Sequence, residues 1–417
     1  MLTVKSLLNC VEKHKGFVYG EVQLLKSSDT PKIEVAIHPR KNSMAICSQC
    51  ERPAPGYDVL AQRRFQYVPL WGMAVVLLYA MRRVACPVCG IKVEKVPWAH
   101  GKSPLTRSFS LFLSVWARRL PWDDVAVIFG TTWNRVYAAV QWVVDYGLAH
   151  RDLSGINAIG IDEITHKKGH HYLTVVYQID QGVRRLLWVG KDRTEETLGC
   201  FFDWFGKDRS DLLRFVCTDM WGPYLKVVGG RAKQAVNILD RFHIMSNMNK
   251  KLDEVRRWET KVLKEQGIEI LKGSRWCFLK RPSNLTASQC EKLKDLLTMN
   301  LRSIKAYLMK EDFQRFWNYT YPANAAKFLD QWCKRTMVSR IEPMKEMARS
   351  LRSHQALLLN WFKAKKLYSS GVVEGLNNKI KTITKKSYGF RTYNVLEVQL
   401  YHTLGELPLP KMTHKFC

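Results

Sequence analysis

The chain has 417 residues, with 66 Lys and Arg against 37 Asp and Glu, which gives a formal net charge of +29. A hydrophobic fraction of 46% with 14 Trp, 16 Tyr and 17 Phe excludes disorder as the main state, because these residues supply the apolar surface that folding must bury. The charge excludes an ordinary enzyme of small acidic metabolites. It is spread over the whole length of the chain and indicates a long polyanion as partner.

The length predicts two to four domains at about 100–200 residues each. Apolar runs stay shorter than the roughly 18 residues of a membrane-spanning helix. The longest, residues 68–81, contains Pro69 and Gly72 and is expected to form a buried strand pair. Eleven cysteines without a recognisable secretion signal indicate a reducing compartment, so we expect an intracellular protein that does not contact a membrane.

After an N-terminal segment, residues 1–40, the next expected domain spans residues 41–100 and contains two cysteine pairs with the same two-residue gap. The cysteines are Cys47, Cys50, Cys86 and Cys89. Because this gap lets a tight turn present two sulfurs to one tetrahedral ion, the spacing predicts a zinc ribbon with a structural Zn²⁺. Four unrelated core thiols are the alternative. The arginines beside the site that we expect to contact DNA phosphates are Arg63, Arg64, Arg82 and Arg83.

Residues 101–150 have helical periodicity in three segments, the last two separated by a turn at Gly130. Two short helices joined by such a turn are typical of a helix-turn-helix DNA-binding domain. The recognition helix is then residues 133–144, with Asn134 and Arg135 near its N-terminus, where base edges are contacted. A helical hairpin without DNA contact is the alternative, but a basic zinc ribbon next to it favours DNA binding.

Residues 151–260 change to a strand pattern, in the order of three strands, a helix, a strand, a helix and a strand. This is the order of a ribonuclease-H-like fold, although order alone leaves other α+β folds open. Residues 261–364 are helical and too long for a connection within a sheet, so they are expected to form an all-α insertion. Residues 365–417 return to the core with a helix that begins at Ser370 or Gly371 and with C-terminal helices. The predicted fold class is multidomain α+β.

Three acidic residues stand out in this basic chain. Asp162 and Asp219 end apolar strands, and Glu374 begins a basic helix. In-line attack at a phosphodiester uses two Mg²⁺ ions about 3.5–4 Å apart, and carboxylates hold such ions while leaving positions for water and substrate. Each acid alone has an ordinary alternative as a strand-end or helix-cap residue. Together they predict a catalytic site with two Mg²⁺ ions, for which Mn²⁺ is a substitute.

Two further groups are expected near these acids. Asp240 ends the last strand of the core and His243 follows one turn later, so both are expected to orient metal ligands or a phosphate, the alternative being a capping Asp and a structural His. A basic run follows Glu374. It is ordinarily a solvated face, but beside a metal site we expect it to follow a DNA backbone. Its members are Lys379, Lys381, Lys385, Lys386 and Arg391.

Taken in chain order, these motifs resemble bacterial insertion-sequence transposases of the ISL3 family. The resemblance covers nearly the whole chain. Its elements are the four-cysteine finger, the helix-turn-helix, Gly160-Ile-Asp162-Glu, Cys217-Thr-Asp219-Met-Trp-Gly-Pro-Tyr224, Asp240-Arg-Phe-His243 and Glu374-Gly-Leu-Asn-Asn-Lys-Ile-Lys. It implies a DDE metal triad of Asp162, Asp219 and Glu374, with the helical insertion between the second Asp and the Glu. Asp240 and His243 match a (C/D)xxH signature.

The resemblance also implies a function. The protein would bind the terminal inverted repeats of its element as double-stranded DNA, cut and transfer strands, join target DNA, and assemble as a homodimer or larger on DNA in the bacterial cytoplasm at the nucleoid. Two alternatives stay open: a non-catalytic DNA-binding regulator derived from a transposase, and a structure-selective nuclease on the same core. The intact carboxylates argue against the first, and against a structural RNA-binding protein.

Overall fold

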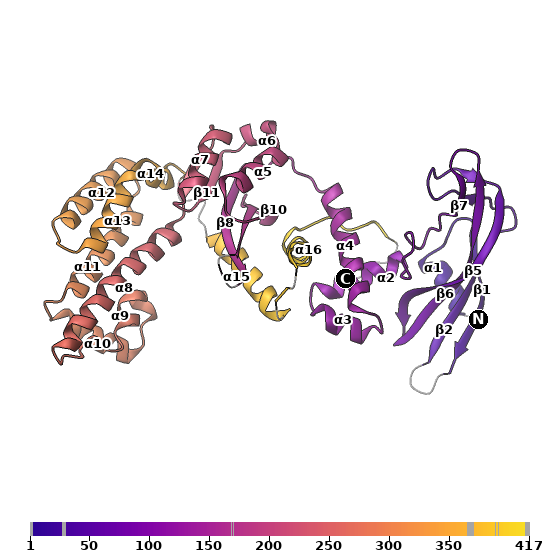
Figure 1. Ribbon diagram of the computed structural model, residues 1–417, viewed down its shortest axis with the longest axis horizontal. Coiled ribbons are helices and arrows are strands. Elements are labelled where there is room, and N and C mark those ends of the chain that lie inside the picture. The colour runs from indigo at the N-terminus through magenta and orange to yellow at the C-terminus, as the bar shows by residue number, and fades with distance from the viewer. Residues whose placement is uncertain are drawn as a thin grey trace. The chain divides into compact units, whose positions relative to one another are not determined.

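The computed structural model describes residues 3–26, 31–167, 169, 171–364, 371–387, 389–390 and 392–412. The chain divides into two compact units. One consists of Met1–Asp152 with Ile380–Cys417, and the other of Leu153–Lys379. Figure 1 labels most of the elements of both. Within the described ranges, no helix is both long and apolar enough to cross a bilayer.

The first unit begins with helix α1 (Val4–Val11) and a five-stranded sheet of order β1-β2-β6-β5, in which β7 also pairs with β6. The expected strand pair at residues 68–81 is the turn end of the long β5–β6 hairpin. Its two-residue turn is Trp71-Gly72, with φ of 49° and 79°, the left-handed geometry that suits a tight hairpin. The strands are β1 (Phe17–Leu25), β2 (Lys32–Pro39), β5 (Gly56–Leu70), β6 (Met73–Cys86) and β7 (Gly90–Val93).

The core of this sheet is built around Trp98, which is fully buried. Its ring meets those of Phe17, Phe65 and Tyr79 edge to face, the arrangement that aromatic quadrupoles favour. Strand β2 pairs in parallel with β6. The N-terminal segment and the cysteine-containing segment therefore share one sheet and one core across the boundary expected at residue 40.

Three helices follow the sheet: α2 (Arg107–Ala117), α3 (Trp122–Ile128) and α4 (Trp133–His150). The turn between α3 and α4 contains Gly130 at φ 58°, as the sequence predicted. Helix α16 (Tyr393–Leu404) packs against α4. A Cβ on Gly147 of α4 would lie 2.5 Å from the Cβ of Leu407, so the glycine allows the segment after α16 to lie directly on α4.

The second unit contains a five-stranded sheet of order β10-β9-β8-β11-β12. The strands β8, β9 and β10 are antiparallel neighbours, whereas β11 is parallel to both β8 and β12. The expected order of strands and helices is present, with a short extra helix α6. The elements are β8 (Ala158–Lys167), β9 (His171–Gln178), β10 (Arg185–Lys191), α5 (Glu195–Phe205), α6 (Lys207–Asp211), β11 (Phe215–Thr218), α7 (Gly222–Arg231) and β12 (Val236–Leu239).

One expectation about this sheet is wrong. The first strand was expected to end at Asp162, but β8 continues to Lys167. Its parallel pairing with β11 stops at Gly160, whereas its antiparallel pairing with β9 goes on to Lys167. Asp162 therefore lies beyond the parallel ladder but inside the antiparallel one.

Between β12 and residue 364 the described chain is helical, as predicted. Helix α14 contacts the sheet, because Asn360 Nδ2 donates a hydrogen bond to the Asn237 carbonyl of β12 at 2.8 Å. The elements are α8 (Arg241–Glu265), α9 (Arg275–Leu279), η1 (Pro282–Asn284), α10 (Ala287–Leu297), α11 (Arg302–Gln314), η2 (Arg315–Asn318), α12 (Pro322–Met337), α13 (Glu342–Ser353) and α14 (Gln355–Lys363).

Helix α15 (Gly371–Lys386) starts at Gly371, one of the two expected positions, whereas Ser370 lies outside the described residues. Its first turn lies close to β8, since a Cβ on Gly160 would be 2.4 Å from Val373 Cγ2. Only a glycine at position 160 allows this approach. The packing sets the position of Glu374, the next residue of the helix.

Candidate catalytic, metal and DNA-binding sites

Both carboxylate oxygens of Asp162, on β8, accept hydrogen bonds. Its side chain is 9% exposed, and Oδ1 accepts the backbone N–H of Glu163 at 2.8 Å. Oδ2 accepts from Asn377 Nδ2 at 2.5 Å, and Asn377 Oδ1 in turn accepts from the Tyr177 hydroxyl at 2.7 Å. Because Asn377 is one turn after Glu374 on α15, this chain of bonds joins the first acid to the helix of the third.

His243 lies between two of the acids. Its Nε2 is 3.5 Å from Asp162 Oδ1 and 3.6 Å from Asp240 Oδ2. Asp240 also caps α8 by accepting the backbone N–H of Phe242 at 2.6 Å. The hydrogen bond to Asp162, followed by the charges of the surrounding acids, raises the pKa of His243 to about 9. The ring is therefore an imidazolium at neutral pH.

Asp219 follows directly after β11, where its Oδ1 accepts the backbone N–H of Trp221 at 2.9 Å. Burial raises the pKa of Asp219, and the negative charges of Asp162 and Glu163 add to that increase against the opposing effect of His243. The first two acids of the predicted triad thus lie within electrostatic range of each other at the same edge of the sheet. Glu163, which sequence reasoning left out, pairs with Arg193 at 2.8 Å.

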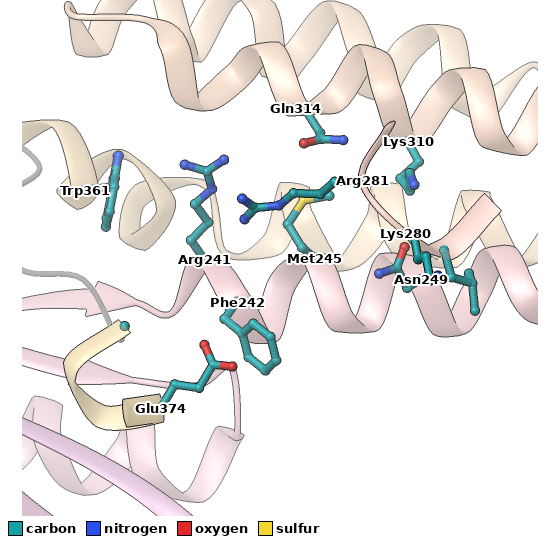
Figure 2. Close-up of a pocket in the computed structure, with 12 residues that line it drawn as sticks. Arg241, Phe242, Met245, Asn249, Lys280, Arg281, Lys310, Gln314, Trp361 and Glu374 are labelled. Atoms are coloured by element: carbon teal, nitrogen blue, oxygen red, sulfur yellow. The ribbon is translucent and has the colours of Figure 1, made fainter. Parts of the chain in front are cut away.

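Glu374, in the first turn of α15, lines a cavity of about 410 Å³. Figure 2 shows its carboxylate next to Phe242, the residue before His243. Among the described residues, the three triad carboxylates do not gather within 4.8 Å of one another. The structure therefore brings Asp162, Asp219 and His243 to one edge and Glu374 to the adjoining cavity.

The donor set at this edge fits divalent cations of the Mg²⁺ type. Its members are hard carboxylate oxygens, which such ions prefer. Burial first, and the negative charges of Asp162 and Glu163 after it, raise the pKa of Asp219, and the His243 ring lies between Asp162 and Asp240. A cation at this edge would offset the burial and the negative charge, so the carboxylates of Asp162 and Asp219 are chemically suited to hold a metal, with Glu374 in the adjoining cavity.

The four predicted zinc ligands do come together. Their four sulfur atoms, those of Cys47, Cys50, Cys86 and Cys89, all lie within 4.8 Å of one another. Among the described residues, this is the only group of metal-ligating side chains that is so close together. The short strands β3 (Ala45–Ile46) and β4 (Pro53–Ala54) form the first turn, and the β6–β7 turn provides the second pair. This closed four-sulfur set fits a structural zinc.

Backbone N–H groups favour thiolates in this cluster. Those of Cys50 and Gln49 lower the pKa of Cys47, and those of Val88 and Cys89 lower the pKa of Cys86 to about 7. Thiolate is the form that binds a metal. In each turn the N–H groups therefore favour the thiolate of the first cysteine, whereas burial raises the pKa of Cys89 to about 12.

The four arginines expected to contact phosphate all have partners in the N-terminal sheet. Arg64 pairs with Glu34 and Arg83 with Asp58. Arg82 pairs with the fully buried Glu94 at 2.7 Å and is itself 18% exposed. The guanidinium of Arg63 donates to the carbonyls of Gly101 and Ser103. Their contribution to DNA binding stays a prediction, and Arg82 in particular has a structural role.

The expected recognition helix is α4, and its two candidate DNA-contacting residues differ in exposure. Asn134 is exposed in the first turn, whereas Arg135 is half-buried and donates to Gln66 Oε1 at 3.0 Å. Along α15 the four lysines are exposed, and Lys386 also donates to the Arg119 carbonyl. Arg391 lies outside the described residues. Asn134 and three of the lysines are therefore accessible for DNA.

Comparison with known proteins identifies the family. A family model for transposases of the ISL3 DDE type matches residues 159–400, more than half of the chain. The chain belongs to the ISL3 family of DDE transposases. It is 27% identical over 350 residues to the transposase for insertion sequence element IS1001 of Bordetella parapertussis, covering 83% of this chain and 85% of that protein. It is 29% identical over 395 residues to the transposase for IS1557 of Mycobacterium tuberculosis, covering 89% and 88%.

Membership in this family makes the chain a DNA-acting enzyme that cleaves and transfers strands, and DDE transposases use divalent metal ions. The match begins at Ile159 in β8 and ends at Leu400 in α16, so all three predicted triad residues lie inside it. Sequence reasoning missed Asn377 and Tyr177. The first had a readable signal, since a position three residues after Glu374 faces the same side of the helix.

Proposed function

We propose that this transposase binds the terminal inverted repeats of its element and cuts and joins DNA strands at Asp162, Asp219 and Glu374. The observation that carries the proposal is the double anchoring of Asp162. Asn377 on the helix of Glu374 holds one oxygen, and His243, just after β12, lies beside the other. One carboxylate thus links the sheet edge to the helix that carries the third acid.

The sheet order and the helical segment between Asp219 and Glu374 support a ribonuclease-H-like core with an all-α insertion. We propose that two Mg²⁺ ions, or Mn²⁺ in their place, are held by the three acids. When bound, such ions activate the attacking hydroxyl and stabilise the leaving oxygen.

The protein's own groups would prepare the site. The N–H groups of Glu163 and Trp221, together with the amide of Asn377, fix the orientation of Asp162 and Asp219 before DNA arrives. His243 supplies a proton and a positive charge beside Asp162. Asp240 holds that ring from the opposite side and caps α8.

DNA recognition is proposed for the N-terminal part, with a zinc-bound ribbon, α4 as recognition helix and Asn134 near base edges. The exposed lysines of α15, Lys379, Lys381 and Lys385, would follow the backbone beside the metals. Because two element ends must be paired, we propose at least a homodimer on DNA, acting at the bacterial nucleoid.

The decisive test is Asp162→Asn, which keeps the shape of the side chain but removes its charge. We expect normal binding of labelled element-end DNA and no Mg²⁺-dependent cleavage. Asp203→Asn is the matched control, because Asp203 is 61% exposed and pairs with Arg231 on the surface. Cleavage that survives in Asp162→Asn overturns the metal assignment. Cleavage of branched DNA without regard to end sequence, and without joined products, would identify a structure-selective nuclease instead.

A further inference from the structure

The cavity next to Glu374 is lined by groups that the proposed chemistry does not use. The long helix α8 contributes Arg241, Phe242, Met245 and Asn249, and the loop after α9 contributes Lys280 and Arg281. Lys310 and Gln314 come from α11, and Trp361 comes from α14. The cavity thus joins the helical insertion to the start of α15. Four of its lining side chains are cationic and one, Glu374, is acidic.

The two lysines already have partners. Lys310 is 3% exposed, lies 2.9 Å from Glu311 and donates to the Phe278 carbonyl at 2.6 Å. Lys280 donates to Gln289 Oε1 at 3.1 Å. Their charges are therefore engaged in the fold, and neither is free to recognise a ligand without breaking these bonds.

The two arginines differ from the lysines. Neither Arg241 nor Arg281 makes an ion pair with any residue that the structure describes. The guanidinium of Arg241 stacks on Trp317 at 5.3 Å and is half-buried. Burial lowers the pKa of Arg241, and the charge of Arg281 lowers it further, so the two cations repel each other. Figure 2 shows both side chains reaching into the same space, with Gln314 above them.

Two guanidinium groups that converge without a carboxylate match the several oxygens of one phosphate group. Arginine presents its donors as a planar fork, which suits phosphate oxygens better than a point charge does. The nearby ring of Phe242 is 50% exposed and lies beside the Glu374 carboxylate in Figure 2, so it offers an apolar surface to the adjoining sugar or base.

We propose that Arg241 and Arg281 bind a single backbone phosphate of the DNA strand that passes from the helical insertion to Glu374. This site deepens the proposed function and rests on it, because it makes the insertion part of the substrate-binding surface. The bound phosphate would lie within the same cavity as the third acid. The distance between the bound phosphate and the phosphodiester that is cut would then be set by the protein rather than by the DNA sequence.

The first experiment does not require transposase activity. Binding of a mixed-sequence single-stranded oligonucleotide to the full chain is measured over a range of salt concentrations. We expect Arg281→Gln to weaken binding about tenfold and to reduce the steepness of log K against log salt by about 0.7, the value for one lost phosphate contact on a single strand. Because Arg281 is exposed, this variant has no buried packing to lose.

Arg241→Gln should have the same effect, and Arg241→Lys should keep the salt dependence while losing affinity, because it keeps the charge and loses the fork. The matched control is Arg302→Gln. Arg302 also lies over an aromatic ring, that of Trp258 at 4.9 Å, but it does not line the cavity. An unchanged salt dependence in both glutamine variants overturns the proposal, as does an equal loss in Arg302→Gln.

The second experiment uses element-end DNA in which single phosphates near the cut are replaced, one at a time, by neutral methylphosphonates. We expect the replacement at one position to weaken DNA binding by the wild type about tenfold and to leave DNA binding by Arg281→Gln unchanged. If every position affects both proteins equally, the phosphate site is wrong. If the wild type cleaves no end DNA at all, the proposed function fails, while the first experiment still decides the cavity.

Discussion

Asn377 donates a hydrogen bond from Nδ2 to Asp162 Oδ2 at 2.5 Å, between residues that are 215 positions apart in the chain. The amide is fixed on its other side by the buried hydroxyl of Tyr177. Burial and the charge of Asp162 raise the pKa of Tyr177, which keeps that hydroxyl protonated as the donor. The orientation of the amide is thus set by two partners, and with it the orientation of the carboxylate.

Asn377→Ala should slow DNA cleavage by about 10- to 100-fold. A hydrogen bond to a charged group contributes roughly 1.5–3 kcal/mol, and its loss leaves Asp162 free to turn away from the site. The measurement is the cleavage rate of labelled end DNA at saturating protein, with binding followed separately. Asn324→Ala, at an exposed position of α12, is the control. A cleavage rate equal to wild type would show that Asn377 has no positioning role.

Local patterns predicted the parts of this protein that depend on nearby residues. The zinc cluster follows from two-residue gaps, and the strands ending at Asp219 and Asp240 follow from apolar runs that stop at an acid. Such features are determined within a few residues, by turn geometry and by the burial of a central strand.

Features that depend on register were not predictable in this way. The parallel pairing of β2 with β6 and the ion pair of Arg82 with Glu94 both need the offset between strands, which a single sequence does not contain. Asp162 illustrates the limit. The apolar run before Asp162 predicted a strand, but the strand continues past Asp162 because β9 pairs with it as far as Lys167. The hydrogen-bond partner of Asp162, Asn377, follows the helical insertion in the chain.

The four-cysteine cluster predicts one zinc ion per chain. Cys86→Ser should lose that ion, because a serine hydroxyl does not replace a thiolate whose pKa the backbone has already lowered to about 7. Metal content is measured by elemental analysis of the purified chain. Cys200→Ser is the control, since Cys200 is exposed and not part of the cluster. Full zinc content in Cys86→Ser would contradict the assignment. So would an equal loss in the control.

The pair of Arg82 and Glu94 predicts a large loss of stability rather than a loss of DNA affinity. Glu94 is fully buried and accepts from the Arg82 guanidinium and from the Tyr79 hydroxyl at 2.6 Å. Glu94→Gln leaves a largely buried cation without its anion, a change that costs about 3–5 kcal/mol. Urea unfolding of the N-terminal sheet measures it. Glu51→Gln removes an exposed pair with Lys95 and should cost much less, because water screens that pair. An equal loss of unfolding free energy in Glu94→Gln and Glu51→Gln would contradict a structural role of the buried pair.

His402 on α16 predicts that the packing of α16 weakens in acid. Burial, followed by the charge of Arg118, lowers the pKa of His402 to about 3. The unfolded chain protonates this ring below its ordinary pKa of 6.5, whereas the folded chain does so only near 3. Its contribution is therefore complete above pH 6.5 and is lost progressively as the pH falls.

Between pH 7.5 and 5 this loss should amount to about 2 kcal/mol, because each pH unit below the unfolded pKa contributes about 1.4 kcal/mol. Hydrogen exchange of the α16 amides at the two pH values, corrected for the intrinsic rates, measures it. In His402→Leu the acid-dependent part should disappear, since the leucine takes up no proton. His150→Leu is the control, because His150 is exposed at the end of α4. If α16 in His402→Leu loses as much protection in acid as the wild type, the buried histidine is not its cause.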